Sequence, residues 1–164
     1  MSGTGKSTAL AELARRGHRV VDTDYGGFSE EVSPSDGRER EQLWREDRID
    51  ALLNEHDDDG VLFISGCVTN QGKFYSRYDA VVLLSAPADL ILERLAVRKT
   101  NDFGKTDAER DLIVHDLVTV EHLLRTTSTA EIDTRAALDE VVDAIERISK
   151  LPNRPIVDRS RRSN

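Results

Sequence analysis

The hydrophobic residues of this 164-residue chain fall into two patterns, and the first is typical of buried strands. Short apolar runs of strand length occupy 61–65 and 80–84, and the segment 19–23 carries Val20 and Val21 between turns. Such runs are typical of parallel strands that are covered on both faces. A weaker run predicts a further strand over 130–133.

The second pattern has the spacing of amphipathic helices. Apolar residues recur every three or four positions over 6–16, about 38–56, 87–97, 106–124 and 138–148. Thr106 and Glu109 have the spacing of a capping box, which predicts a helix start just before an apolar stripe from Leu112 to Leu124. Strand and helix therefore alternate, and the pattern predicts an α/β fold with an open, mostly parallel sheet flanked by helices.

Composition narrows the class of protein. The formal charge of -8 disfavours a nucleic-acid or membrane-binding surface and favours a small ligand held by local positive charge. The single cysteine, Cys67, cannot form an intramolecular disulfide, and the first thirty residues lack a secretion signal. We therefore expect a soluble, cytoplasmic protein with one domain over 1–150 and a disordered tail over 151–164, which is rich in Pro, Arg and Ser.

The residues just before the first predicted helix carry phosphate-binding chemistry. Ser2-Gly3-Thr4-Gly5-Lys6-Ser7-Thr8 matches the downstream part of the pattern G-x-x-x-x-G-K-[ST]. The glycines allow backbone N–H groups to converge on phosphate oxygens, Lys6 would lie against the β- and γ-phosphates, and Ser7 would bind Mg²⁺. The predicted nucleotide-binding set here is Gly3, Thr4, Gly5, Lys6, Ser7 and Thr8. The alternative is an ordinary glycine turn that caps a helix.

The first glycine of this pattern would fall one position before Met1. The strand that normally leads into the loop would also lie before Met1. We expect that the chain as given starts late, at an internal methionine. The alternative is a loop that is shaped without the usual strand before it.

The chain resembles the small P-loop kinases of the adenylate kinase and shikimate kinase group over about residues 1–150. The resemblance implies a three-layer P-loop NTPase-like fold in which the first, central strand of the sheet is missing from the chain as given. It implies ATP and Mg²⁺ as cofactors, an acceptor-binding insertion over 26–59 and a short lid over 98–105.

Asp22-Thr23-Asp24 closes the second predicted element and is similar to the D-x-D signature of shikimate kinases. Acids at i and i+2 of an extended segment point the same way, so both could face one ion and one acceptor hydroxyl. The resemblance implies that Asp22 and Ser7 bind the metal and that Asp24 orients the acceptor and accepts its proton. Two solvated acids at a strand end are the alternative.

Leu92-Glu93-Arg94-Leu95-Ala96-Val97-Arg98 resembles the E-R-x-x-x-R segment of adenylate kinases. Spacing of i and i+4 would place both arginines on one helix face. The resemblance implies that Arg94 stacks on the adenine, that Arg98 reaches phosphate as a catalytic residue, and that Arg135 lies near the adenine edge. The alternative is a pair of solvated arginines.

Other features bear on the acceptor. A lone Gly66 follows the 61–65 strand where shikimate kinases have three glycines, which argues against shikimate as the substrate. The polar segment 69–74 fits either a polar acceptor or a plain surface loop, and Trp44 is expected to be a packing residue beside two arginines, Arg45 and Arg48, that could bind an acidic acceptor. We predict ATP-dependent phosphoryl transfer to a hydroxyl of a small polar metabolite by a monomer or homodimer with no nucleic-acid or membrane partner. A nucleoside or nucleotide kinase and a non-catalytic ATP-binding regulator are the alternatives.

Overall fold

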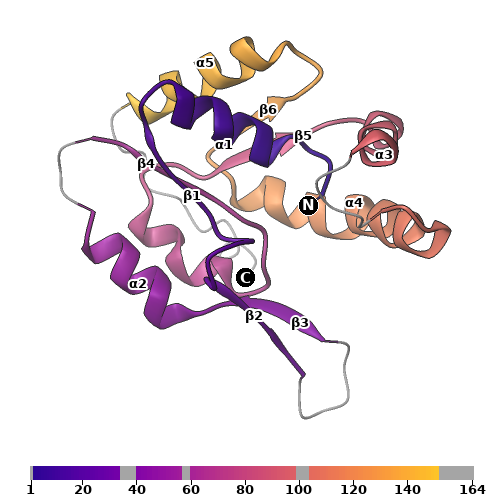
Figure 1. Cartoon of the computed structure of the whole chain (residues 1–164), viewed down its shortest axis with the longest axis horizontal. Coiled ribbons are helices and arrows are strands. Elements are labelled where there is room, and N and C mark those ends of the chain that lie inside the picture. Colours follow the sequence, from indigo (N-terminus) through magenta and orange to yellow (C-terminus); the bar gives the residue numbers. More distant parts are fainter. Residues whose placement is uncertain (1, 34–39, 57–59, 99–103, 152–164) are drawn as a thin grey trace, which may run out of the picture. The chain divides into compact units, whose positions relative to one another are not determined.

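The computed structural model describes residues 2–33, 40–56, 60–98 and 104–151 (Figure 1). The chain divides into two compact units, each with its own strands and helices. The first unit contains residues 6–78, and the second contains residues 1–5 together with 79–164.

In the first unit, a helix packs on a pair of parallel strands. Its elements are α1 (Lys6–Arg15), β1 (Arg19–Asp22), β2 (Ser29–Val32), β3 (Glu41–Trp44), α2 (Glu46–Asn54), β4 (Leu62–Ser65) and the 3₁₀ helix η1 (Gln71–Arg77). β1 pairs with β4 in parallel from Arg19↔Leu62 to Asp22↔Ser65. α1 packs on this pair and buries Ala9, Leu10 and Leu13, so the predicted helix face and strands are confirmed.

The helix predicted over about 38–56 is wrong in its first part. Residues 29–32 and 41–44 instead form the antiparallel hairpin β2–β3, and α2 begins only at Glu46. Tertiary hydrogen bonds favour the extended chain here: the Asn70 side chain accepts from the Trp44 N–H at 2.8 Å and donates to the Trp44 carbonyl at 2.9 Å. These long-range contacts satisfy the Trp44 backbone in place of helical bonds.

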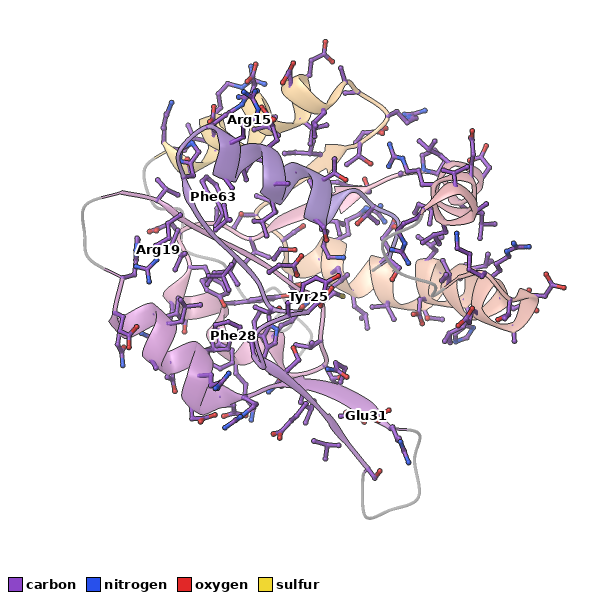
Figure 2. All side chains as sticks on the ribbon, in the orientation of Figure 1. Arg15, Arg19, Tyr25, Phe28, Glu31 and Phe63 are labelled. Atoms are coloured by element: carbon purple, nitrogen blue, oxygen red, sulfur yellow. The ribbon has the colours of Figure 1, made fainter. Side chains whose placement is uncertain are left out.

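Trp44 lies at the centre of the core of the first unit. It is 5% exposed and packs with Ile49, Val68 and Phe74, and its ring centroid is 5.8 Å from that of Phe74. Phe28, labelled in Figure 2, packs against the same cluster from the chain segment before β2. The prediction that Trp44 is a packing residue is therefore confirmed.

The second unit repeats the scheme of a parallel pair covered by helices. Its elements are β5 (Val82–Ser85), α3 (Ala88–Val97), α4 (Asp107–Thr127), β6 (Ala130–Asp133) and α5 (Leu138–Ser149). β5 pairs with β6 in parallel from Val82↔Ala130 to Ser85↔Asp133, and α5 buries Val141, Val142 and Ile145. The strand predicted over 130–133 and the last predicted helix are thus confirmed.

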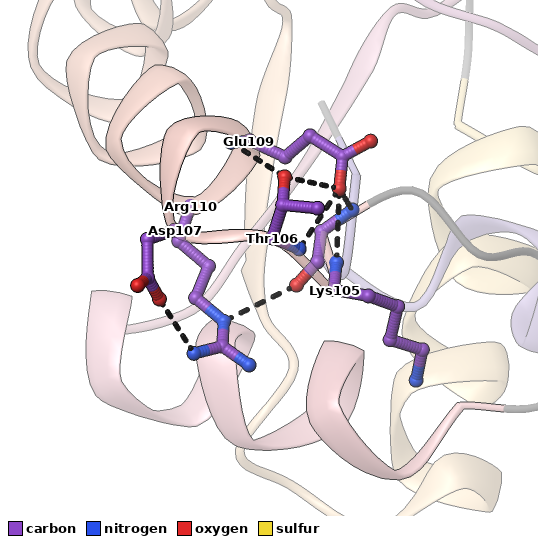
Figure 3. Close-up of polar contacts among 6 residues, drawn as sticks. Lys105, Thr106, Asp107, Glu109 and Arg110 are labelled. Carbon is purple, nitrogen blue, oxygen red and sulfur yellow. Dashed lines mark hydrogen bonds and ion pairs between the residues drawn. The ribbon is translucent and has the colours of Figure 1, made fainter.

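The start of α4 confirms the predicted capping box (Figure 3). The Thr106 side chain and the Glu109 side chain form the reciprocal capping box. Of the predicted stripe only Ile113 is buried, against Ile91 and Leu95 of α3, whereas Leu112 and Leu123 are 46% and 62% exposed. Leu117 also packs against this cluster, so α4 contacts α3 through part of its apolar stripe.

The described parallel strands form two separate pairs, β1–β4 and β5–β6. The α/β class with parallel strands agrees with the prediction, and the three-layer arrangement stays a prediction. Within the described residues, no helix combines the length and the apolar character needed to span a bilayer.

Candidate functional site

The glycine loop contains two residues with left-handed backbone angles. Gly3 and Gly5 have φ angles of 78° and 90°, a left-handed region that residues with a Cβ rarely adopt. A Cβ on Gly3 would also lie 2.7 Å from Ile91 Cγ2, so a larger residue would have to displace α3. Thr4 between them is 2% exposed. Alternating left-handed glycines are a means of turning successive N–H groups toward a bound anion.

The first turn of α1 brings two of the predicted site residues together. Lys6, Ser7 and Thr8 begin the helix, with Lys6 half-buried and the two hydroxyl residues exposed. The Ser7 hydroxyl donates to Asp22 Oδ2 at 3.0 Å, from the start of α1 to the end of β1. The two residues predicted to bind Mg²⁺ are therefore hydrogen-bonded to each other.

Asp24 does not share an extended segment with Asp22, as the sequence had suggested. β1 ends at Asp22, and the chain then turns, with the Asp24 N–H donating to Asp22 Oδ1 at 3.2 Å and the Tyr25 N–H to the Asp22 carbonyl at 3.2 Å. Asp22 thus closes an Asx turn, which is a common way for an aspartate to end a strand. Asp24 is exposed on this turn, two residues from the Ser7–Asp22 pair.

Behind Asp22, a buried polar group holds the ends of β1 and β4 together. Thr23 is 0% exposed, and its N–H and its hydroxyl both donate to the Ser65 carbonyl, at 2.9 and 2.8 Å. The Trp44 indole N–H donates to Thr23 Oγ1 at 2.8 Å. A Cβ on Gly66 would lie 2.2 Å from Thr23 Oγ1 and 2.8 Å from Trp44 Cζ2, so this position excludes a side chain.

Ser65, which the sequence did not single out, lies beside Asp22 at the end of β4. Its Cα is the register partner of Asp22, and its Oγ is buried with no hydrogen-bond partner among the described residues. Buried hydroxyls are nearly always hydrogen-bonded, so an unpaired one needs an explanation. The signal available in the sequence was only its position, as the last residue of a buried strand.

In the second unit, the Arg94 guanidinium forms hydrogen bonds within the protein. Its two terminal nitrogens donate to Thr134 Oγ1 at 2.9 Å and to the Thr134 carbonyl at 2.6 Å. Arg135 pairs with Asp133, its Nε donating to Oδ2 at 2.8 Å, and this contact holds the pKa of Asp133 below its ordinary value. Of the two arginines predicted to bind nucleotide, Arg94 of α3 thus contacts Thr134, and Arg135 follows Thr134 just after β6.

Arg98 lies beyond α3, so the expectation of one helix face for Arg94 and Arg98 is wrong. α3 ends at Val97, and Arg98 has extended backbone angles of φ -64° and ψ 135°. Lys105, expected in the lid, instead caps this helix: its ammonium donates to the carbonyls of Leu95, Ala96 and Arg98 at 2.7, 2.9 and 2.6 Å. The part of the predicted lid over 99–103 lies outside the described residues.

The donors at the end of β1 suit Mg²⁺. The ion prefers oxygen ligands, keeps several waters, and takes one or two carboxylates in addition to substrate phosphates. Ser7 offers a hydroxyl and Asp22 a carboxylate. In the described part of the chain no three His, Cys, Asp or Glu side chains gather into a cage, so His115 and His122 complete no metal site there. The described donors fit an ion that is shared with phosphate.

Comparison with known proteins identifies the family. The family model described as an AAA domain matches residues 1–115, from the glycine loop into α4. No curated protein matches the chain. The family has a P-loop NTPase-like domain and includes P-loop kinases, among them nucleotide kinases, so nucleotide binding with Mg²⁺ is its general property. Since the match covers well over half of the chain, this protein belongs to the AAA domain family of P-loop NTPase-like proteins.

Proposed function

We propose that this protein transfers the γ-phosphoryl group of Mg²⁺·ATP to a hydroxyl of a small polar metabolite. The observation that carries the proposal is the 3.0 Å hydrogen bond from Ser7 to Asp22, which joins the phosphate-binding helix to the end of a neighbouring strand. A plain glycine turn that caps a helix would not require a carboxylate at this point. Membership of a family that includes P-loop kinases supports the same chemistry.

Each group has a defined task in this reaction. The N–H groups of the loop and Lys6 would hold the β- and γ-phosphates, while Ser7 and Asp22 would hold Mg²⁺, which neutralises charge on the transferring group when bound. The acceptor oxygen forms a bond to the γ-phosphorus as the bond to the bridging oxygen breaks, and ADP leaves. The exposed Asp24 carboxylate would orient the acceptor hydroxyl and take its proton.

The charges of the acceptor region favour an acceptor that carries no phosphate. Between residues 26 and 78, each described lysine and arginine already donates to a carboxylate, amide or carbonyl oxygen of the protein. These residues are Arg40, Arg45, Arg48, Lys73 and Arg77. A nucleoside monophosphate would need arginines to bind its phosphate, so a neutral hydroxyl compound fits better.

A coupled assay of ADP release across a panel of sugars, cyclitols, nucleosides and nucleoside monophosphates tests this proposal. We expect turnover with a neutral hydroxyl compound and a loss of at least about a hundredfold in Lys6→Ala, because the lysine contacts the transferring phosphates. If the protein binds Mg²⁺·ATP and no acceptor increases ADP release above slow hydrolysis, the non-catalytic regulator is the better description.

A further inference from the structure

We infer that the Ser65 hydroxyl is a positioning residue for the nucleotide-bound Mg²⁺, through one of the waters of that ion. The inference rests on the proposed function, since it takes the Ser7–Asp22 pair as the metal-binding point. It adds a residue that neither the phosphate loop motif nor the D-x-D signature contains.

The first step in the argument is the face of the sheet on which Ser65 lies. Asp22 and Ser65 are Cα partners in the parallel pair β1–β4, so their side chains leave the sheet on the same side. The residues that follow confirm this alternation: Thr23 Oγ1 is 2.2 Å from the place of a Cβ on Gly66, so these two positions share the opposite side. Ser65 therefore lies on the side where Asp22 meets Ser7.

The second step concerns the hydrogen bonding of the Ser65 hydroxyl. Its Oγ is buried and has no hydrogen-bond partner among the described residues. Burial of a hydroxyl without a partner is unfavourable, and such groups persist where a ligand or water satisfies them. The carbonyl of the same residue is in contrast fully used, since it accepts both the N–H and the hydroxyl of Thr23.

The third step is a comparison with Ser85, which has the same place at the end of β5. Ser85 is the Cα partner of Asp133, as Ser65 is of Asp22. The pKa of Glu131 is lowered first by Arg125 and then by the nearby Ser85 side chain. The hydroxyl at one strand end is thus used within the protein, whereas its counterpart at the metal-binding end is left for an external partner.

The external partner that fits is a metal-bound water. Mg²⁺ keeps several waters when it binds to protein and phosphate, and the waters of a cation donate strongly. A serine hydroxyl can accept such a hydrogen bond while Asp22 accepts another. Groups that orient a metal ion in this indirect way typically change its affinity by about ten- to a hundredfold when they are removed.

Two serine variants of the full chain, Ser65→Ala and Ser85→Ala, test the inference. Calorimetry would measure the affinity for Mg²⁺·ATP and the Mg²⁺ concentration needed for ATP binding, and thermal unfolding would measure Tm. We expect Ser65→Ala to weaken Mg²⁺-dependent binding about tenfold while its Tm stays equal or rises, because an unsatisfied hydroxyl is removed. Ser85→Ala should lower Tm and leave the Mg²⁺ dependence unchanged.

The possible results separate this inference from the proposed function. If Ser65→Ala binds Mg²⁺·ATP as tightly as the wild type, or if its Tm falls as far as that of Ser85→Ala, Ser65 has a structural role and the inference is wrong. If the wild type itself binds no Mg²⁺·ATP, both the proposed function and the inference fail. If the wild type binds without turnover and Ser65→Ala binds more weakly, the inference stands although phosphoryl transfer does not.

Discussion

The ends of the two parallel strand pairs share the same hydrogen bonds to a backbone carbonyl but differ in the side chains that contact them. In the first unit the Thr23 N–H and hydroxyl donate to the Ser65 carbonyl at 2.9 and 2.8 Å. In the second, the Thr134 N–H and hydroxyl donate to the Ser85 carbonyl at 2.8 and 3.1 Å. Each threonine follows an aspartate whose Oδ1 accepts the N–H two residues later, at 3.2 and 2.9 Å.

The two ends differ in what faces the aspartate and the threonine. Asp133 meets the cation Arg135, and Thr134 is held by the cation Arg94. Asp22 instead accepts from a neutral hydroxyl and a neutral N–H, and Thr23 from the neutral Trp44 indole. The two hydrogen bonds that Asp22 accepts from Ser7 and Asp24 therefore involve no cationic side chain, whereas Asp133 forms a surface ion pair with Arg135. The same backbone arrangement thus carries a different set of side-chain partners at each strand end.

The largest expected effect concerns the two aspartates. Asp22→Asn should lower kcat/KM for the preferred acceptor about a hundredfold and raise the Mg²⁺ requirement, since an amide is a poor substitute for a carboxylate beside Mg²⁺. Asp133→Asn should leave the Mg²⁺ requirement as it is in the wild type. Steady-state kinetics at graded Mg²⁺ would measure both. Equal changes in Mg²⁺ requirement for the two variants would break the distinction between the two ends.

A second test uses Gly66, the residue that follows Ser65 at the end of β4. Because a Cβ on Gly66 would collide with Thr23 and Trp44, we expect Gly66→Ala to lower the free energy of unfolding by about 3 kcal/mol, as overpacked sites do. Gly72→Ala is the matched control, since a Cβ there meets nothing within 4 Å. Denaturant unfolding would measure both, and a tolerated Gly66→Ala would mean that the end of β1 is loosely packed.

A third test asks how strongly Trp44 fixes Thr23. Trp44→Phe removes the 2.8 Å bond to Thr23 Oγ1 and leaves a small cavity, so the free energy of unfolding should fall by about 1–2 kcal/mol. Combining it with Thr23→Val gives a double-mutant cycle that isolates the interaction between the two side chains. Strictly additive effects would show that the hydrogen bond does not couple them.

The smallest expected effect is a pH dependence in the second unit. Glu109 Oε2 accepts the N–H groups of Gly104, Lys105 and Thr106 at 3.1, 3.1 and 3.0 Å, and these bonds hold the pKa of Glu109 below 4.5 (Figure 3). A carboxyl with a lowered folded-state pKa stabilises the protein fully above its unfolded pKa and loses this contribution as pH falls.

Glu109→Gln should therefore lower Tm by about 2–4 °C at neutral pH, with a smaller difference from the wild type below pH about 4. Glu93→Gln, at an exposed position of α3, is the control and should change Tm little at either pH. Thermal unfolding followed at several pH values would measure the difference. A constant difference across this range would rule out the carboxylate as its cause.

The sequence predicted the features that are determined locally. The strands over 19–23, 61–65 and 80–84, the capping box at Thr106 and the helix after the glycine loop all depend on residues close to one another in the chain. Ser7 and Asp22 also lie in contact, because a helix and the strand after it constrain each other closely. That both bind one metal ion stays a prediction.

The features that the sequence did not predict depend on distant residues. β3 is extended because Asn70, 26 positions away, satisfies the backbone of Trp44. Arg98 leaves the helix where the Lys105 ammonium caps the last carbonyls of α3. The buried hydroxyl of Ser65 could not be identified either, because whether a serine has a partner depends on the neighbours that the fold gives it.

The single tryptophan of the chain touches the residue next to Asp22. Indole emission responds to its hydrogen bonding and to nearby charge, so this protein carries its own optical probe next to the carboxylate that we propose binds Mg²⁺. Nucleotide titrations followed by intrinsic fluorescence would then report on the end of β1 without any label, at protein concentrations far below those that calorimetry needs.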